Sequence, residues 1–516
     1  MEALDWLVIG VFFLALIGII VWVVRQKQND SADYFLGGRD ATWLAIGASI
    51  FASNIGSEHL IGLAGAGASS GMAMAHWEIQ GWMILILGWV FVPFYSRSMV
   101  YTMPEFLERR YNPQSRTILS VISLVSYVLT KVAVTVYAGG LVFQQVFGIK
   151  ELWGIDFFWI AAIGLVVLTA LYTIFGGMKS VLYTSVLQTP ILLLGSLIIL
   201  VLGFKELGGW DEMMRVCGAV TVNDYGDTMT NLIRSNDDAN FPWLGALIGS
   251  AIIGFWYWCT DQFIVQRVLS GKNEKEARRG TIFGAYLKLL PVFLFLIPGM
   301  IAFALHQKYI GAGGEGFLPM LENGTANADA AFPTLVAKLL PAGVKGLVVC
   351  GILAALMSSL ASLFNSSAML FTIDFYKRFR PETPEKKLVG IGQIATVVIV
   401  ILGILWIPIM RSVGDVLYTY LQDVQSVLAP GIAAAFLLGI CWKRTSAQGG
   451  MWGLIAGMVI GLTRLGAKVY YSNAGEVADS TFKYLFYDMN WLFFCGWMFL
   501  FCIIVVIVVS LATEAP

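Results

Sequence analysis

Charged residues are scarce in this 516-residue chain. They make up 13% of the sequence, whereas 58% of the residues are apolar and the mean hydropathy is +0.76. Soluble domains use roughly 25% charged and about 45–50% apolar residues, so the composition excludes a soluble protein and indicates one that lies in a membrane. Basic and acidic residues balance at 33 each, which gives no electrostatic basis for binding nucleic acid.

Cysteine and histidine are also rare. The six cysteines lie mostly inside apolar runs, which argues against a disulfide framework, and three histidines without a cysteine/histidine cluster argue against a structural metal. The stretch "GGMKS" at 176–180 lacks the GxxxxGK[ST] spacing of a phosphate-binding loop, so an ATP-driven pump is not expected. No nucleophile stands beside a base at motif spacing, and we therefore expect neither an enzyme nor an organic cofactor.

Long apolar runs, by contrast, are abundant. A helix needs about 20 apolar residues to cross a hydrocarbon layer roughly 30 Å thick, and about thirteen such runs leave no room for a soluble domain. They predict an all-α polytopic membrane protein that forms a single transmembrane domain over 1–516. The runs lie at 5–25, 41–70, 72–95, 117–147, 155–175, 181–204, 241–262, 280–307, 340–370, 387–410, 412–441, 449–470 and 488–512.

Basic residues predict the orientation of these runs. Glu2 and Asp5 precede the first run, Arg25 and Lys27 follow it, and no small-residue cleavage site appears, so we interpret it as a helix and not as a signal peptide. If the loops alternate from there, most of the lysines and arginines fall on the inner side, as the positive-inside rule requires. We expect a plasma (inner) membrane protein with its N-terminus outside.

One apolar region carries an unusual number of polar residues and glycines. The segment "FASNIGSEHLIGLAGAGASSG" at 51–71 contains Asn54, Glu58 and His59. Within hydrocarbon every backbone amide and carbonyl must be paired, so such an interruption persists only where it faces protein or water. Broken spans of this kind coordinate cations and solutes in many secondary transporters. Close helix packing through small residues is the alternative, but it explains the glycines and not the polar side chains.

Other polar groups occur in or beside apolar runs, where an ionisable side chain marks a pathway or a partner. They are Glu78 in "AHWEIQG", Lys131 in "VLTKVAV", Lys288 in "GAYLKLLP" and Gln422 in "YLQDVQS". Lys131 can instead pair structurally, and Glu78 and Lys288 can neutralise each other. Hydroxyls in "LAALMSSLASLFNSS" (353–367) and the aromatic stretch "FWYWCTDQF" (255–263) are ambiguous on their own, since hydroxyls often bond back to the helix and aromatics often anchor at an interface.

Eight motifs together identify a family resemblance. They are "FASNIGSEHLIGLAG", "YTMPEFLERRY", "LYTIFGGMKSVLYT", "WYWCTDQFIVQRVLSGKN", "YLKLLP", "AALMSSLASLFNSS", "TIDFYK" and "FLLGICWKR". In sequence and order they resemble the sodium/glucose cotransporters of the solute:sodium symporter family, including the sodium/myo-inositol members. The resemblance runs from roughly residue 35 to 470 and implies the leucine-transporter-like fold. Its two inverted five-helix repeats would span 41–204 and 241–441, with an extra helix at 5–25 and extra C-terminal helices at 449–512.

The resemblance also implies two sets of site residues. A sodium ion would bind the carbonyl oxygens of Ala52, Ile55 and Ala355 and the hydroxyls of Ser358 and Ser359, a neutral oxygen set that suits a hard cation that must leave again. The proposed solute site comprises Asn54, His59, Glu78, Trp258, Lys288 and Gln422, with Tyr257 as an inner gate. These groups match sugar hydroxyls, which donate and accept hydrogen bonds at once, while a ring face stacks on an aromatic plane.

Three positions depart from the family pattern. Gly254 stands where sugar transporters commonly have a small hydroxyl residue, and Trp77 stands where phenylalanine or tyrosine is usual, so both can change which solute fits. Ser185 replaces the aspartate of the usual "YTD", in the region proposed for a second sodium. This substitution favours one sodium per solute.

The predicted function is therefore a sodium-driven hexose symporter that works by alternating access as a monomer in the lipid bilayer. A sodium/myo-inositol or other polyol symporter is the nearest alternative, favoured by the inositol-like run "SNIGSEH". A sugar-gated sensor or channel of the same fold is another. The expected partners are sodium and a small sugar or polyol, with no nucleic acid.

Overall fold

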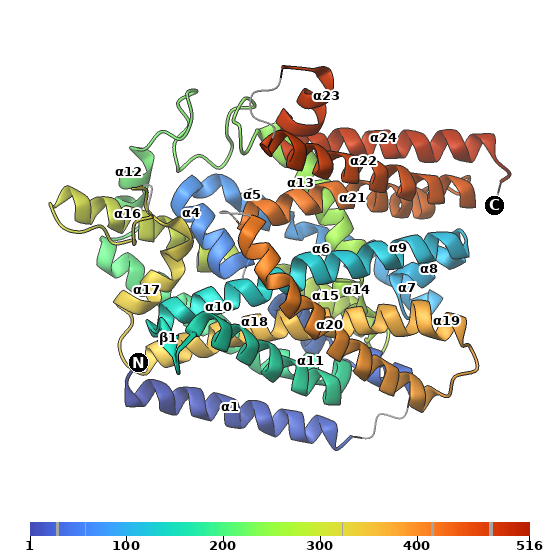
Figure 1. The fold of residues 1–516 in the computed structure, drawn as a ribbon, viewed down its shortest axis with the longest axis horizontal. Coiled ribbons are helices and arrows are strands. Elements are labelled where there is room, and N and C mark those ends of the chain that lie inside the picture. Colours follow the sequence, from blue (N-terminus) through green and yellow to red (C-terminus); the bar gives the residue numbers. More distant parts are fainter. Residues whose placement is uncertain (27–29, 57, 322–323, 414–416, 474–477, 516) are drawn as a thin grey trace.

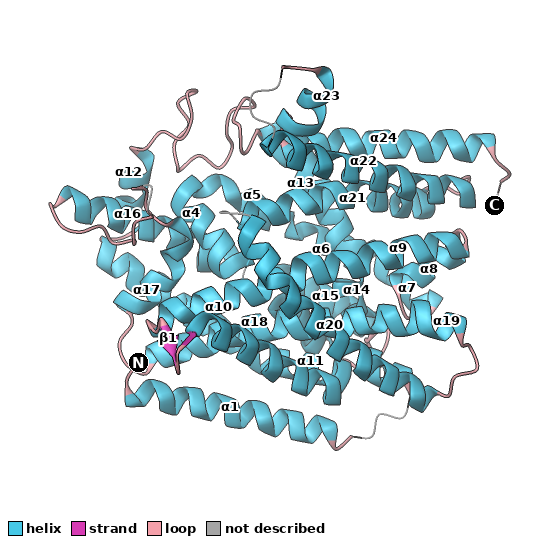
Figure 2. Cartoon of the chain, in the orientation of Figure 1, coloured by secondary structure: helices cyan, strands magenta, loops and turns pink. Residues whose placement is uncertain are grey.

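Helices account for most of the chain in the computed structural model, which describes residues 1–26, 30–56, 58–321, 324–413, 417–473 and 478–515. Most of them run side by side along the long direction of the molecule (Figure 1), and Figure 2 shows one short β-hairpin. The hairpin pairs β1 (Glu151–Leu152) with β2 (Ile155–Asp156). The architecture confirms the all-α prediction.

Two helices border the bundle on opposite sides. They are α1 (Ala3–Val24) and α24 (Trp491–Ala512), and α18 (Val344–Met369) runs between them through the centre (Figure 1). The two chain ends lie at opposite ends of the bundle. Most of α18 is buried, including every residue from Ala354 to Met369, whereas α1 exposes apolar residues such as Leu7 and Leu14. A helix that exposes apolar residues in this way is suited to contact lipid.

Helical segments long and apolar enough to cross a membrane number ten among the described residues, which supports a multi-pass membrane protein. Two shorter apolar helices cover Trp43–Asn54 and Ala133–Gln144. The expected total of about thirteen spans stays a prediction. The ten segments are Ala3–Val24, His59–Ser98, Phe157–Leu207, Trp243–Thr260, Glu274–Gly311, Val344–Phe379, Glu385–Pro408, Val424–Cys441, Ala447–Tyr471 and Trp491–Ala512.

The segment α11 (Phe157–Leu207) covers two of the expected runs, 155–175 and 181–204. Its helical geometry is interrupted at Gly177, where φ is +52° and a β-carbon would collide with the carbonyl oxygen of Tyr34. Only glycine adopts this backbone conformation without strain. The two expected runs are therefore two helices that meet at a kink at Gly177.

The remaining elements are mostly short because many helices are interrupted. The other α-helices are α2 (Ser31–Leu36), α3 (Trp43–Asn54), α4 (Ala64–Ser70), α5 (Ala75–Ile79), α6 (Met83–Ile86), α7 (Val92–Ser98), α8 (Met103–Arg110), α9 (Pro113–Ser126), α10 (Ala133–Phe147), α12 (Trp210–Gly218), α13 (Trp243–Phe255), α14 (Gln262–Leu269), α15 (Glu274–Leu287), α16 (Ile297–Gly311), α17 (Ala331–Leu339), α19 (Lys377–Phe379), α20 (Glu385–Val413), α21 (Leu417–Cys441), α22 (Ala447–Asn473) and α23 (Thr481–Lys483).

Wider π-helical turns join several of these helices, and such turns often occur at functional sites. They are η2 (Glu58–Leu63), η5 (Leu87–Phe91), η6 (Tyr127–Val132), η7 (Trp256–Thr260), η8 (Val292–Leu296), η10 (Leu370–Tyr376) and η11 (Tyr484–Asp488). Tighter 3₁₀ turns cover η1 (Gly37–Arg39), η3 (Gly71–Met74), η4 (Gln80–Trp82) and η9 (Ala328–Ala330).

Close helix contacts place the polar segments next to one another. The helix α3 packs against α11, α15 and α18, and α18 packs against α11. Gly47 of α3 faces Gly280 and Gly284 of α15, so closely that a β-carbon at Gly47 would lie 2.8 Å from the Gly280 carbonyl oxygen. Small residues allow this approach in membrane bundles, and it brings the end of α3 into the middle of the bundle.

Candidate functional site

The centre of the site is a break in the helical backbone. The helix α3 ends at Asn54, Ile55 is extended with φ −79° and ψ 102°, and helix resumes as the π turn η2 from Glu58. Ile55 and Gly56 are fully buried or nearly so. The polar, glycine-containing segment thus interrupts a buried helix, where freed backbone carbonyls need other partners.

Hydroxyls of α18 supply some of those partners. The Ser359 hydroxyl donates to the carbonyl oxygens of Ser53 at 2.8 Å and Ile55 at 3.3 Å. A β-carbon on Gly56 would lie 2.9 Å from Ser359 Oγ, so the glycine permits this approach. The break and α18 together gather neutral oxygens at one buried place, which is the chemistry that a sodium ion prefers.

The rest of the predicted sodium set lies on the same two helices. Ala52 and Ala355 are each 1% exposed, and Ser358 Oγ lies 3.2 Å from Ser185 Oγ of α11. Ser185 also donates to the Val181 carbonyl oxygen at 2.6 Å. The Ser185 hydroxyl therefore adds a further neutral oxygen beside Ser358.

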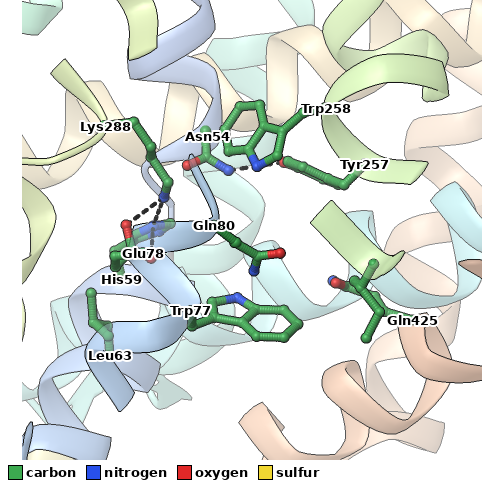
Figure 3. Close-up of a pocket in the computed structure, with 11 residues that line it drawn as sticks. Asn54, His59, Leu63, Trp77, Glu78, Gln80, Tyr257, Trp258, Lys288 and Gln425 are labelled. Atoms are coloured by element: carbon green, nitrogen blue, oxygen red, sulfur yellow. Dashed lines mark hydrogen bonds and ion pairs between the residues drawn. The ribbon is translucent and has the colours of Figure 1, made fainter. Parts of the chain in front are cut away.

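Three ionisable side chains meet beside the break. The Lys288 ammonium lies 2.6 Å from a Glu78 carboxylate oxygen and 2.8 Å from His59 Nε2, and this His59 nitrogen is 3.2 Å from the other Glu78 oxygen (Figure 3). All three are buried, with exposures of 1–4%. We call Glu78, Lys288 and His59 the charge triad. Opposite charges at this depth must pair, because burying either alone is costly.

Aromatic side chains form the next wall of the pocket. Trp258 lies in the π turn η7, and its ring faces the Lys288 ammonium at 5.6 Å from the ring centroid. Tyr257, its neighbour, accepts a hydrogen bond from the Asn54 amide at 3.0 Å (Figure 3). The predicted solute residues Asn54, His59, Glu78, Trp258 and Lys288 and the predicted gate Tyr257 therefore line one cavity.

The cavity includes residues that the sequence reading did not select. Gln80, Gln425, Leu63 and Ile253 line it, and so does Trp77. The side chain of the predicted Gln422 lies outside the described residues. Gln425 follows it by one helical turn in "YLQDVQS", a spacing that points both side chains to the same helix face, and this signal could have found it. Gln80, two residues after Glu78, had no comparable signal.

Several buried polar atoms of the cavity have no hydrogen-bond partner among the described residues. They are Asn54 Oδ1, His59 Nδ1 and Gln80 Oε1. Leaving a buried polar atom unpaired costs about 1–3 kcal/mol, so these atoms favour a bound molecule that completes them. Asn54 Oδ1 and Gln80 Oε1 are acceptors, which a hydroxyl satisfies and a carboxylate repels.

A second buried ion pair lies between η6 and the start of α14. The Lys131 ammonium is 2.7 Å from an Asp261 carboxylate oxygen, and the Tyr127 hydroxyl donates to the other. The ammonium also lies 4.6 Å from the centroid of the Tyr257 ring. We call Lys131, Asp261 and Tyr127 the inner cluster. Lys131 thus has the structural partner that was the alternative in the sequence reading.

The fold and this site together define a helical membrane transporter with a broken first helix in its core. A solved sodium-coupled sialic acid symporter in a substrate-bound outward-open state has the same fold, with a TM-score of 0.79, 21% identity and coverage of 100% of this chain and 99% of that one. MhsT in complex with L-phenylalanine is more distant, with a TM-score of 0.53, 12% identity and coverage of 92% and 99%. These likenesses confirm the leucine-transporter-like fold.

Sequence relatives narrow the class to a family. The family model "Sodium:solute symporter family" matches residues 34–457. Sodium/myo-inositol cotransporter 2 of Mus musculus is 37% identical over 530 aligned positions, which cover 100% of this chain and 78% of the relative. Sodium/glucose cotransporter 1 of Ovis aries is 38% identical over 543 positions, covering 99% and 79%.

The chain belongs to the sodium:solute symporter family, as its motifs predicted. Its relatives are transporters and not enzymes, which also confirms that expectation. Sodium is accordingly the coupling ion.

Proposed function

We propose that this protein is a sodium-driven symporter that imports a hexose such as glucose, galactose or mannose by alternating access. Its relatives are named for sugar and polyol cotransport, which supports sodium-coupled transport of this solute class. The observation that carries the proposal is the buried cavity at the charge triad, with unpaired acceptors on Asn54 and Gln80. Glu78 and Lys288 neutralise each other, so the cavity favours a neutral solute rich in hydroxyls.

The broken helix provides a route for coupling. The carbonyls of Ser53 and Ile55 face Ser359, whereas the side chain of Asn54, between them in sequence, lines the solute cavity. A sodium ion held by Ala52, Ile55, Ala355, Ser358 and Ser359 would fix the backbone that positions Asn54. Coupling requires that sodium stabilise one arrangement more than the other, and this shared segment gives a physical means.

The size of the cavity supports a conformational change during transport. Its volume is about 30 Å³, far below the roughly 300–1,000 Å³ of pockets that hold drug-sized ligands. A hexose therefore enters only if the walls move apart. Tyr257 and Trp258, from η7, and Trp77, from α5, are the large side chains that must move relative to each other.

One sodium ion per solute suffices energetically. A membrane potential of 100 mV contributes roughly 2.3 kcal/mol per charge, and a tenfold sodium gradient adds about 1.4 kcal/mol. The sum of about 3.7 kcal/mol supports accumulation of several hundredfold at full coupling. Ser185, a neutral residue beside Ser358, favours this stoichiometry because it adds no carboxylate for a second ion.

We further propose the organisation that the resemblance implies, with inverted repeats at 41–204 and 241–441 and extra helices at 5–25 and 449–512. Each repeat begins with an interrupted helix, which is extended at Ile55 in the first and at Asp261 in the second. The chain ends lie at opposite ends of the bundle (Figure 1), which supports placing them on opposite sides of the membrane. The excess of basic residues in alternate loops supports an N-terminus outside the plasma membrane and a C-terminus inside. We expect the monomer in the lipid bilayer to be the functional unit.

Uptake into vesicles tests the proposed function. Purified protein in vesicles is expected to accumulate labelled glucose, galactose or mannose above the external concentration only under an inward sodium gradient. Uptake that ignores sodium would rule out symport. Solute-evoked current without accumulation would instead identify a sensor or channel.

A polyol is the second candidate solute. The similarity to sodium/myo-inositol cotransporter 2, which covers the whole chain, favours it. A competition panel of hexoses, myo-inositol and acyclic polyols against the labelled solute decides between them. The compound with the lowest half-inhibitory concentration defines the class.

A further inference from the structure

Gln80 occupies the solute cavity without a structural role that explains its amide. It begins the turn η4, two residues after Glu78, and is 6% exposed. In Figure 3 its amide points into the space between Trp77 and Tyr257. Its Oε1 is buried and has no hydrogen-bond partner among the described residues. An apolar side chain of the same size would fill the space without the cost of burying an amide.

The position of this amide depends on Gly254, on the facing helix α13. A β-carbon at Gly254 would lie 2.5 Å from Gln80 Oε1 and 3.4 Å from Gln80 Cδ. The first distance is too short for any real contact, so another residue at 254 would displace the amide. Gly254 is the position where similar sugar transporters commonly have a small hydroxyl. The space of that side chain is here taken by an amide from the opposite wall.

Gln80 also separates two cavities. The second, of about 380 Å³, lies between α5, α13 and the loop 219–242, and its lining includes His76, Arg234, Phe241 and Trp243. Gln80 forms part of both linings. Truncating it to alanine would therefore remove its hydrogen-bonding amide and also join the two cavities. Methionine at this position keeps the length of the side chain and removes only the hydrogen-bonding groups.

We propose that Gln80 is a solute-binding residue that determines specificity, with Gly254 as the residue that makes room for it. Its amide accepts a hydrogen bond from one hydroxyl of a neutral polyhydroxy solute through Oε1. A hydroxyl side chain at position 254 would contact the solute from the α13 wall of the cavity. In this protein the Gln80 amide makes that contact from the opposite wall, next to α5. The choice of ligand class rests on the proposed function.

Four variants test this pair: Gln80→Met, Gly254→Ala, Gln80→Ala and the double variant Gln80→Ala/Gly254→Ala. Gly164→Ala is the matched control, because Gly164 is helical in α11 and a β-carbon there meets nothing within 4 Å. Solute binding to each purified full-length protein is measured from the solute-dependent rise in melting temperature with sodium present, since a ligand that binds the folded state stabilises it. The probes are glucose, myo-inositol and their single-deoxy analogues.

We expect Gln80→Met to weaken binding of the preferred probe about five- to tenfold, the effect of one lost hydrogen bond. One deoxy analogue should bind the parent and Gln80→Met equally, which identifies the hydroxyl that Gln80 contacts. Gly254→Ala should weaken binding about fivefold in the parent and less than about twofold when residue 80 is alanine, because the two positions are in contact. Gly164→Ala should match the parent.

Two results would overturn the proposal: parental affinity in Gln80→Met, or an equal cost of Gly254→Ala in both backgrounds. Failure of the proposed function is a different result. In that case parent vesicles concentrate none of the probes, whereas the binding measurements still report whether Gln80 contacts a hydroxyl. A folding defect is recognised separately, as a lower melting temperature without any solute.

Discussion

Two of the buried ion pairs differ in what surrounds them. In the charge triad, Glu78 and Lys288 meet His59 at the wall of a cavity, next to polar atoms without partners among the described residues. In the inner cluster, both Asp261 carboxylate oxygens are bonded, and aromatic rings surround Lys131. Burial and pair distance are nearly the same, so these properties alone do not distinguish a binding site from a structural contact.

The difference lies in how completely each pair is satisfied. Asp261 accepts from Lys131, from Tyr127 and from the Phe263 amide at 3.1 Å, so it also caps the start of α14. Within the described parts of the chain, the triad instead leaves His59 Nδ1 without a hydrogen-bond partner, and Asn54 Oδ1 and Gln80 Oε1 in the same cavity lack one too. A complete network stabilises one arrangement, whereas an incomplete one binds a molecule that completes it. Tyr257 contacts both, through Asn54 and through Lys131.

The largest effect is expected from breaking the triad. Glu78→Gln leaves the buried Lys288 without a counter-charge, and loss of one partner of a buried pair costs about 3–5 kcal/mol. We expect sodium-driven uptake to fall at least about 100-fold. Glu212→Gln is the control, because Glu212 pairs with Arg215 in α12 at the protein surface. Near-parental uptake by Glu78→Gln would contradict the assignment of the triad to solute binding.

The inner cluster should respond differently to removal of the whole pair. Asp261→Asn alone should lower the melting temperature by several degrees, because Lys131 stays buried. The double change Lys131→Met/Asp261→Leu should recover most of this loss, since apolar residues often replace a buried pair at no net cost. The corresponding double change Glu78→Leu/Lys288→Met should restore melting temperature but not solute binding. If the double variant of the charge triad bound solute as well as the double variant of the inner cluster, the two pairs would not differ in function.

A smaller effect is expected at the sodium oxygens. Ser359→Ala removes a hydroxyl that contacts the carbonyls of Ser53 and Ile55. The sodium concentration for half-maximal uptake should therefore rise about tenfold, which corresponds to a loss of about 1.4 kcal/mol of binding free energy with one oxygen ligand. Solute affinity at saturating sodium should change little. Thr463→Ala is the control, because its hydroxyl only bonds back to the Val459 carbonyl. An unchanged sodium requirement would place the ion elsewhere.

The smallest effect concerns a third buried pair, Arg234 and Asp238, in the loop 219–242 between α12 and α13. Burial alone would raise the pKa of the Asp238 carboxyl, but hydrogen bonds from the Phe241 amide, Asn223 and the Asn240 amide, together with Arg234, lower it below the ordinary value of 3.8. A carboxyl with a lowered pKa stabilises the fold above its unfolded pKa and loses this contribution as the pH falls through the folded value.

Asp238→Asn should therefore lower the melting temperature slightly at neutral pH. The difference in melting temperature between the variant and the parent should shrink as the pH drops below about 4. The Asp238 carboxyl of the parent is then protonated and, like the asparagine, carries no charge. Melting curves of both proteins across this range provide the measurement. A difference that grows on acidification would show that the carboxylate is not stabilising.

The sequence predicted those features that composition and local spacing determine. Scarce charge and long apolar runs predicted the helical membrane fold, and the polar residues at 51–71 predicted a break in the first core helix. Glu78 and Lys288 were expected either to pair or to bind solute. Partners distant in sequence could not be predicted in this way. Asp261 lies 130 positions from Lys131, and no local pattern connects them.

The contact between Gln80 and Gly254 could not be predicted from the sequence either. A glutamine in an apolar span is as compatible with a surface or a helix contact as with a cavity, and a glycine shows only that a side chain is absent. The close approach between them emerges from the packing of α5 on α13. The kink at Gly177 has the same origin, because an apolar count finds the two runs on either side of it but not the backbone conformation that joins them.

The small volume of the solute cavity also bears on the leakage of ions across the membrane. A space of about 30 Å³ is far below the roughly 300–1,000 Å³ of pockets that hold drug-sized ligands, so in this arrangement the solute site offers no wide water-filled passage. A protein that rests in this arrangement would not by itself dissipate the sodium gradient.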